Sequence, residues 1–286
     1  MVETIGLTTR SGLTFTADVA GPADGPLVLL LHGFPESRHS WREALPVLAA
    51  AGHRCVAPDQ RGYSPAARPD PADLSNYAFD KLVNDAVEIV AAAGHEGRRF
   101  HLVGHDWGGQ VSWGVAAAHP GRLASLTILS RPHPKSFRRA LDKPDGEQKN
   151  RSRHHRAFLD TETGKLLLAD DARRLRDGLF GQGVPAAALE EHLSVLGHPE
   201  AMEAALAWYR ANIGLAADIG MIEVPTLYIW GDVDATVGPD AAHGTGDFVS
   251  AVYTMEVLPG VGHFVMDQAP AKATELLLAH LKKHPV

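Results

Sequence analysis

Apolar and polar residues follow two different periods along the first half of the chain. Short apolar runs bounded by turn residues predict strands, whereas apolar residues that recur every three to four positions predict helices. Residues 27–31 are wholly apolar, as expected for a strand buried on both faces of a sheet. Helical spacing is clearest between Phe79 and Gly94. The alternation of the two patterns predicts an α/β fold with a mostly parallel central sheet flanked by helices.

The pattern of apolar and polar residues changes between about residues 132 and 218, where no strand pattern occurs. The predicted strands cover residues 13–19, 26–31, 53–57, 99–103, 123–129, 225–230 and 251–257, and the predicted helices cover 41–51, 79–93, 110–118, 170–179, 186–196 and 271–281. We therefore expect a core of residues 1–131 and 219–286, interrupted by a helical insertion at 132–218. Parallel sheets bind ligands at their carboxyl edge, so such an insertion is expected to form a lid, or cap, over the site.

Composition narrows the class of protein. The 286 residues are 45% hydrophobic and 21% charged, which is ordinary for a globular protein. The 27 Lys and Arg against 34 Asp and Glu give a net charge of −7, so nothing favours a nucleic-acid partner. No apolar run is long enough to cross a membrane, and residues 1–20 lack the pattern of a signal peptide. Cys55 is the single cysteine, which excludes an internal disulfide and makes a cytoplasmic location the expectation.

Two features of the charged residues call for interpretation. Sixteen histidines invite a metal site, but the sequence lacks His-Glu-x-x-His and any comparable ligand spacing, so we expect no metal and no cofactor. Residues 131–156 contain nine Lys or Arg and three Asp or Glu. We interpret this run as a solvated face of the lid rather than an anion-binding patch, because aromatic residues that could stack on bases are nearly absent.

The strongest local signal is Gly104-His105-Asp106-Trp107-Gly108, between a predicted strand and a predicted helix. This is the context of a nucleophile elbow, a sharp turn that exposes one side chain at the sheet edge. The helix N-terminus that follows favours an anion there. Asp106 holds the exposed position, and an ionised carboxylate can attack an electrophilic carbon without a base. The pattern predicts an ester on Asp106, which base-activated water must then hydrolyse.

Candidate partners follow in the chain order nucleophile, acid, histidine. Asp232 and Asp234 come directly after one predicted strand, and His263 lies in a glycine-rich loop after the next. We expect His263 to be the general base, with one of the two aspartates accepting its other ring N–H. The backbone N–H groups of Phe34 and Trp107 are the expected donors to the oxyanion of the tetrahedral intermediate.

Five motifs together resemble the epoxide hydrolases of the α/β-hydrolase fold. They are His32-Gly33-Phe34-Pro35-Glu36, Asp59-Gln60-Arg61-Gly62-Tyr63-Ser64, Gly104-His105-Asp106-Trp107-Gly108-Gly109, Trp208-Tyr209-Arg210 and Gly260-Val261-Gly262-His263. The resemblance covers the core and reaches the end of the predicted lid. It implies an α/β-hydrolase fold with the lid inserted after the sixth strand, a small-molecule epoxide as substrate, Asp106 as nucleophile and His263 as base. It also implies Asp234, rather than Asp232, as the acid.

Epoxide opening leaves an alkoxide that needs a hydrogen bond or a proton. Relatives supply it from two lid tyrosines, and the resemblance places the second at Tyr209. Tyr209 is the only tyrosine between residues 132 and 218, so the first is replaced. The best match is His154, with His155 as the alternative, since an imidazole N–H can donate to an epoxide oxygen. Both histidines can instead belong to the solvated basic run.

Other enzymes share parts of this pattern. Haloalkane dehalogenases use the same Asp nucleophile and are the alternative, but they often have an Asn where this chain has Phe34, and Tyr209 suits epoxide opening better. Fluoroacetate-type dehalogenases typically have an Arg where this chain has Trp107. Asp106 excludes a serine esterase at this elbow. In a non-catalytic relative we would expect a missing nucleophile, base or acid, and none is missing.

Overall fold

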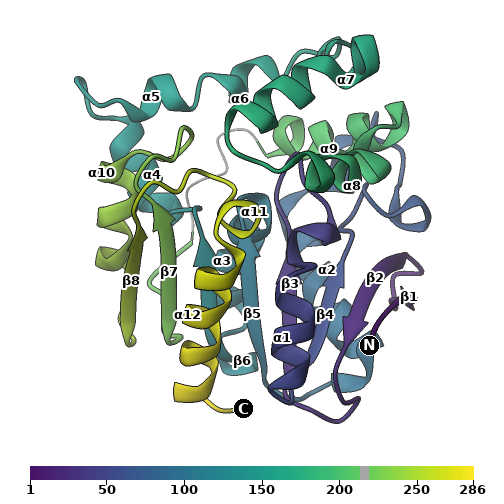
Figure 1. Cartoon of the computed structure of the whole chain (residues 1–286), viewed down its shortest axis with the longest axis vertical. Coiled ribbons are helices and arrows are strands. Elements are labelled where there is room, and N and C mark those ends of the chain that lie inside the picture. The colour runs from purple at the N-terminus through teal and green to yellow at the C-terminus, as the bar shows by residue number, and fades with distance from the viewer. Residues whose placement is uncertain (213–218) are drawn as a thin grey trace.

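The computed structural model describes residues 1–212 and 219–286. Eight strands form one sheet in the order β1-β2-β4-β3-β5-β6-β7-β8 (Figure 1). β1 pairs antiparallel with β2, and β2 pairs antiparallel with β4, whereas the strands from β4 to β8 are parallel neighbours. The strands span Val2–Thr8, Thr14–Ala20, Leu27–Leu31, Arg54–Pro58, Phe100–His105, Leu123–Leu129, Thr226–Gly231 and Tyr253–Leu258.

Helices cover both faces of the parallel strands, which explains the wholly apolar sequence of β3. Leu29 and Leu31 pack into the core that includes α2 and α3, whereas Val28 and Leu30 pack into the core that includes α1 and α12. Successive residues of a strand point to opposite faces, so a strand between two helical layers needs an apolar side chain at every position. The core helices are α1 (Ala44–Ala50), α2 (Phe79–Val90), α3 (Trp107–Ala118), α10 (Pro239–His243), α11 (Val265–Gln268) and α12 (Pro270–Lys283).

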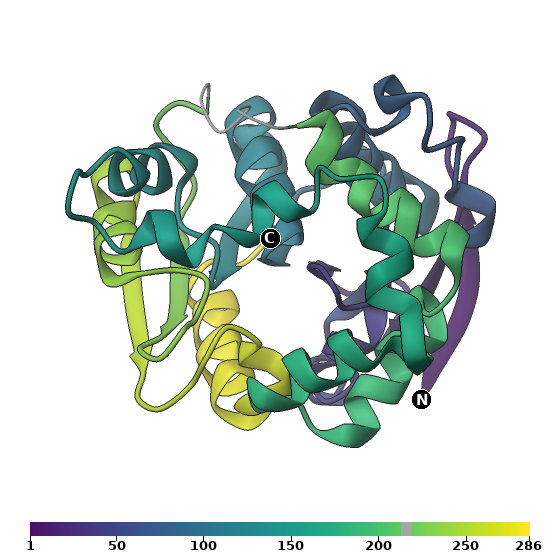
Figure 2. The ribbon, with the colours of Figure 1, turned by 90° about the horizontal axis from the view of Figure 1, so that it is seen from above.

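The described residues between β6 and β7 form six further helices. They are α4 (Pro134–Leu141), α5 (Gln148–Arg151), α6 (His154–Ala157), α7 (Thr163–Gly181), α8 (Ala186–Leu196) and α9 (Pro199–Ala211). α4 contacts α10, and α5 to α9 lie above the carboxyl edge of the parallel strands (Figures 1 and 2). The helices therefore cover the edge where the loops after the strands gather.

The structure confirms the predicted α/β-hydrolase architecture, in which the helical segment follows the sixth strand. The one strand that the sequence pattern missed is β1, whose residues are mostly exposed and so form no apolar run. The predicted helix at 170–179 is part of the longer α7, which is interrupted at 169–172. The division into core and lid stays a prediction. The last residues of the predicted lid, 213–218, lie outside the described residues.

A search of residues 1–212 and 219–286 finds no helix that combines the length and the apolar character needed to span a membrane.

Candidate active site

Asp106 lies at the sharp turn between β5 and α3. Its backbone has φ 47° and ψ −114°, a conformation that L-residues rarely adopt and that turns the side chain out of the sheet. Two glycines make room for this turn. A Cβ atom on Gly33 would lie 2.5 Å from Cβ of Asp106, and one on Gly108 would collide with the carbonyl of Leu31. The strained turn therefore requires the backbone at the end of β3 to lie very close to it, which only glycine at these two positions allows.

The Asp106 carboxylate is buried, and polar groups of the protein contact both of its oxygens. Its Oδ1 accepts a hydrogen bond from the backbone N–H of Phe34 at 3.0 Å, and its Oδ2 lies 3.7 Å from Nε2 of His263. Burial raises the pKa of Asp106, but the nearby imidazole of His263 outweighs burial and holds that pKa well below its ordinary value. Asp106 is therefore ionised at neutral pH, as an attacking carboxylate must be.

His263 lies between two carboxylates. Its Nδ1 faces Asp234 at 3.0 Å from Oδ2 and 3.2 Å from Oδ1. Burial alone would lower its pKa, but the charge of Asp234 and the interaction with Asp106 raise the pKa of His263 to about 10. Asp232, the other candidate acid, is exposed and accepts a hydrogen bond from Gly260 N–H instead. The structure thus brings Asp234, and not Asp232, to the histidine.

Asp234 is held rigidly, partly by a residue that the sequence analysis did not identify. Its Oδ1 accepts the backbone N–H groups of Thr236 and Val237 at 2.7 and 2.9 Å, and its Oδ2 accepts the hydroxyl of Ser130. Ser130 follows β6 with φ 64°, and its Oγ is also 3.2 Å from Nδ1 of His263. The sequence pattern that could have indicated Ser130 is its position directly after the predicted strand at 123–129, because residues at the carboxyl ends of parallel strands gather at the site.

A second imidazole supports the loop that carries His263. His105 precedes Asp106, and its Nδ1 lies 2.6 Å from Oε2 of Glu36 while its Nε2 lies 2.8 Å from the carbonyl of His263. Both partners are acceptors, so both ring nitrogens must carry protons. Burial opposes this, but Glu36 raises the pKa of His105, and His105 lowers the pKa of Glu36 to about 2. This buried ion pair positions the His263 backbone.

Tyr209 projects from α9 into the space above Asp106. The neighbouring Trp208 is fully buried, and its indole N–H donates to the carbonyl of Arg61 at 3.0 Å. Arg61 is itself fixed by a two-point ion pair with Asp85 of α2, at 2.6 and 2.7 Å. Tyr209 meets Trp107 edge to face, with ring centroids 5.1 Å apart. The motif around Arg61 thus anchors the helix that presents Tyr209.

Two cavities meet at Asp106. The first, of about 530 Å³, is lined by Phe34, His154, Tyr209 and His263 as well as Asp106. The second, of about 520 Å³, lies toward α4 and is lined by Asp106, Trp107, His155 and Tyr209, among others. All the predicted site residues except Asp234, which lies behind His263, therefore line one or both cavities.

The two lid histidines differ in what they face. His154 lines the first cavity together with His263, whereas His155 lines the second cavity and packs against Tyr209 with ring centroids 5.6 Å apart. Burial lowers the pKa of His154, and burial together with the neighbouring His154 lowers the pKa of His155 to about 3. Both are therefore neutral at neutral pH, and either can donate only its single ring N–H.

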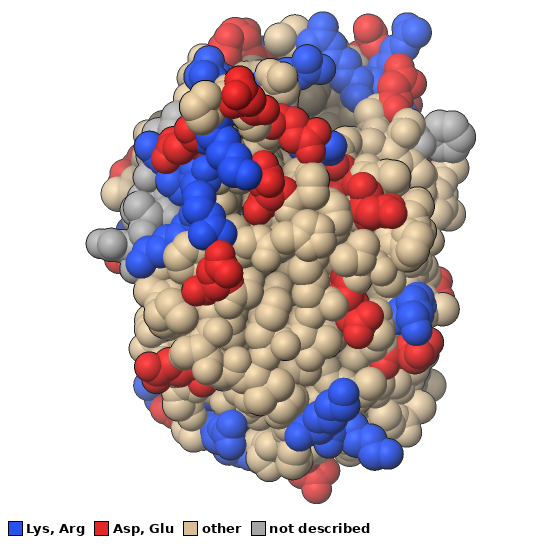
Figure 3. Space-filling model, turned by 90° about the vertical axis from the view of Figure 1, so that its left-hand side faces the viewer, with Lys and Arg blue, Asp and Glu red and all other residues tan. Residues whose placement is uncertain are grey.

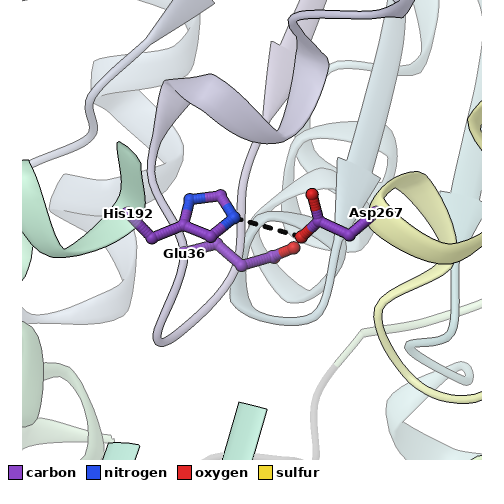
Figure 4. A group of neighbouring side chains, drawn as sticks. All are labelled: Glu36, His192 and Asp267. Carbon is purple, nitrogen blue, oxygen red and sulfur yellow. Dashed lines mark hydrogen bonds and ion pairs between the residues drawn. The ribbon is translucent and has the colours of Figure 1, made fainter. Parts of the chain in front are cut away.

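One buried cluster joins α8 to the core. Glu36, His192 and Asp267 each offer one potential metal ligand, and these atoms lie within 4.8 Å of one another (Figure 4). His192 is already engaged on both ring nitrogens, with Asp267 at 3.0 Å and Ser37 Oγ at 3.1 Å. Arg42 donates to the other oxygen of Asp267 at 2.8 Å. We interpret the cluster as a hydrogen-bonded link between lid and core.

Known proteins match this arrangement along most of its length. The model of the alpha/beta hydrolase fold family matches residues 26–270. The chain belongs to the α/β-hydrolase family. The AB hydrolase superfamily protein YfhM of Bacillus subtilis is 31% identical over 281 residues, covering 95% of this chain and 96% of its own length.

Several relatives of this α/β-hydrolase bear the name that the motifs led us to expect. Epoxide hydrolase A of Mycobacterium tuberculosis is 30% identical, over 96% of both chains. A solved structure from work on epoxide hydrolases in metagenomes of hot environments superposes with a TM-score of 0.84 and 27% identity, covering 98% of this chain and 99% of the other. The resemblance to this superfamily, predicted from five motifs, is confirmed.

The charge of Asp106 is predicted to set the pKa of His263. Asp106→Asn removes one of the two carboxylates that stabilise the imidazolium, so we expect the pKa of His263 to fall by about one unit or more. Titration of the imidazole nitrogens by NMR measures this value. Asp232→Asn is the control, because it removes an exposed carboxylate from the loop that carries Asp234. An equal fall in both variants would show that general charge, rather than the Asp106 contact, sets the pKa.

The His192 cluster is predicted to stabilise the lid against the core. His192→Ala leaves Oδ2 of Asp267 and the Ser37 hydroxyl without their hydrogen-bond partner, while Arg42 still binds Oδ1 of Asp267, so the free energy of unfolding should fall by about 3 kcal/mol. Chemical denaturation measures the change, with His198→Ala as the control, because His198 is an exposed histidine at the start of α9. The link has no energetic importance if the two variants are equally stable.

Proposed function

We propose that this α/β-hydrolase is an epoxide hydrolase that converts an epoxide to a vicinal diol through an ester on Asp106. The observation that carries the proposal is the pairing of an ionised carboxylate with a protonated phenol, Tyr209, on the walls of the same cavities. A carboxylate supplies the nucleophile for an oxirane carbon, and a phenol supplies the proton for its oxygen. The epoxide hydrolase names among the relatives support the same reaction.

In the first step, one oxygen of Asp106 forms a bond to an epoxide carbon while the carbon–oxygen bond of the ring breaks. Oδ2 is the oxygen available for attack, because Oδ1 accepts the Phe34 N–H. Burial and the charge of Asp106 raise the pKa of Tyr209 well above its ordinary value, so the phenol holds its proton until an alkoxide develops. Tyr209 donates that proton, and the neutral N–H of His154 is the second donor to the ring oxygen.

In the second step, water attacks the carbonyl carbon of the ester, and His263 takes a proton from it. The backbone N–H groups of Phe34 and Trp107 stabilise the oxyanion. Its collapse breaks the bond between the carbonyl carbon and the diol oxygen, which takes the proton from His263, and the acid form of Asp106 then returns a proton to the imidazole. Forming the ester converts Asp106 into a neutral group. Because the charge of Asp106 helps to raise the pKa of His263, ester formation lowers that pKa. The imidazolium then gives up its proton, which restores the Tyr209 phenol, and neutral His263 becomes available as the base.

The contact made by the Trp208 indole favours epoxide opening over dehalogenation. A departing halide needs N–H donors, and the indole of Trp208 is the lid candidate. That indole is fully buried and donates to the carbonyl of Arg61 at 3.0 Å, so it does not face the cavities. The Trp107 indole lines the second cavity and lies edge to face against Tyr209. α9 therefore presents a phenol, and not a second indole N–H, to the cavities, and a phenol suits a developing alkoxide.

Removal of the base is predicted to trap the ester. His263→Gln should still be alkylated by styrene oxide, because attack by Asp106 needs no base, but it should not release diol. Intact-protein mass spectrometry should show an increase of one epoxide mass, located on Asp106 by peptide mapping. The His263→Gln, Asp106→Asn double variant is the control and should gain no mass. An adduct that persists in the double variant would place the attack on another residue.

Loss of the Tyr209 hydroxyl is predicted to slow ring opening. Tyr209→Phe should reduce the single-turnover rate of alkylation by about 100-fold, the usual contribution of one general acid. Rapid quench of enzyme in excess over styrene oxide measures this rate. Tyr253→Phe is the matched control, because the Tyr253 hydroxyl lacks a hydrogen-bond partner among the described residues and lies on β8. Similar rates in the two variants would remove Tyr209 from the reaction.

A further inference from the structure

The walls of the two cavities carry a strong excess of positive charge. Among the residues that the structure describes, Asp106 is the only carboxylate that lines either cavity. Seven cationic side chains line them: Arg131, Arg138, Lys149, Arg151, Arg153, Arg156 and Arg174. This excess occurs in a chain whose net charge is −7, so it is local to the site. Clefts lined by one sign of charge concentrate ligands of the other sign.

Most of the basic run does behave as a solvated surface. On the side of the molecule that carries α4, α5 and α10, Lys and Arg gather beside Asp and Glu (Figure 3). Arg138 pairs with Asp142 at 2.9 Å, and Arg151 pairs with Glu147 at 3.1 Å. Exposed pairs of this kind contribute little to affinity for a ligand. A cavity cation that is not exposed to solvent and that has no carboxylate partner among the described residues differs from these, because its charge is left for a ligand to neutralise.

Arg131 is that cation. It follows Ser130 at the end of β6 and lines the second cavity together with Asp106. Its Nε donates to Oε1 of Gln110 at 3.0 Å, and its guanidinium lies 4.8 Å from the ring centre of Phe137. These two contacts fix the plane of the group. Within residues 1–212 and 219–286, no oxygen accepts from its two terminal amino groups, and it forms no ion pair.

The surroundings of Arg131 disfavour its charge. Burial lowers the pKa of Arg131, and the charge of Asp106 offsets this only in part. In the ester intermediate Asp106 is neutral, so Arg131 then loses the one carboxylate in its cavity. An anionic group on the substrate would supply a counter-charge in both states. A planar guanidinium with two free amino groups matches a carboxylate in particular, because it can donate two parallel hydrogen bonds.

We propose that Arg131 binds a carboxylate of the substrate, so that the preferred substrates are epoxides that carry a carboxylate group. This inference rests on the proposed epoxide hydrolase function and names the substrate class of that site. The oxirane lies at Asp106, and the carboxylate extends into the second cavity to Arg131. The exposed cations at the rim, including Lys149 and Arg156, attract the anion from solution.

The test compares matched substrates that differ in one charge. Styrene oxides with a carboxylate at the meta or para position are compared with the corresponding primary carboxamides, which have nearly the same shape. The wild type should show a kcat/KM about 10- to 100-fold higher for at least one carboxylate than for its amide, the usual gain from charged hydrogen bonds. The preference should weaken as salt is added.

Variants of Arg131 assign the preference to this residue. Arg131→Gln should abolish the ratio between carboxylate and amide, mainly by raising KM for the carboxylate, and Arg131→Lys should restore part of it. Arg173→Gln is the control, because Arg173 is a lid cation paired with Asp177 at 3.6 Å and lines neither cavity. The proposal is overturned if the wild type does not prefer either carboxylate, or if Arg131→Gln leaves the ratio unchanged.

Binding of the product separates this inference from the reaction itself. The diol of the carboxylated styrene oxide is titrated calorimetrically into wild type and Arg131→Gln, beside the diol of the amide. Tight binding of only the carboxylate diol, lost in Arg131→Gln, supports the anion site even if no epoxide is turned over, in which case the proposed reaction alone fails. Equal binding of the two diols overturns the anion site, even if both epoxides are hydrolysed.

Discussion

The burial of an ionised carboxylate at Asp106 is the constraint on which the rest of the site depends. An unpaired charge in a protein interior is expensive, and most buried acids avoid the cost by taking up a proton. Asp106 keeps its charge because the Phe34 N–H, the start of α3 and His263 replace the water it has lost. Each of these groups comes from a different segment, so the fold must be complete before the carboxylate is reactive.

Charge balance extends beyond the three residues nearest the reaction. Behind Asp106 and His263 lie Asp234 on one side and the pair of Glu36 and His105 on the other. Carboxylates and imidazoliums alternate through this network, so each buried charge has a neighbour of opposite sign. When Asp106 is alkylated, one negative charge disappears from the network. The loss of that charge destabilises the imidazolium of His263, which is the group that must release its proton in the proposed reaction.

The parts of the site that the sequence predicted are those tied to local backbone patterns. A strand, a glycine-flanked turn and a helix locate Asp106, and chain order locates His263. The residues alone left Asp232 and Asp234 equivalent, because only tertiary packing determines which one is buried. The basic run was interpreted as surface, and the sequence could not single out Arg131, since its role depends on the cavity wall that Gln110 and Phe137 form around it.

The anchoring of α9 has a consequence for how this enzyme can diversify. Trp208 and Asn212 fix the helix to the core through the carbonyls of Arg61 and Tyr77, while Tyr209 between them faces the reacting groups. The proposed proton donor is thus carried by a helix that is hydrogen-bonded to the core on both sides of it. On the opposite wall, formed by α4 to α7, only His154 has a proposed part in the reaction. Mutation of the other residues there can change which substrates enter the cavity while the proposed reacting groups stay in place.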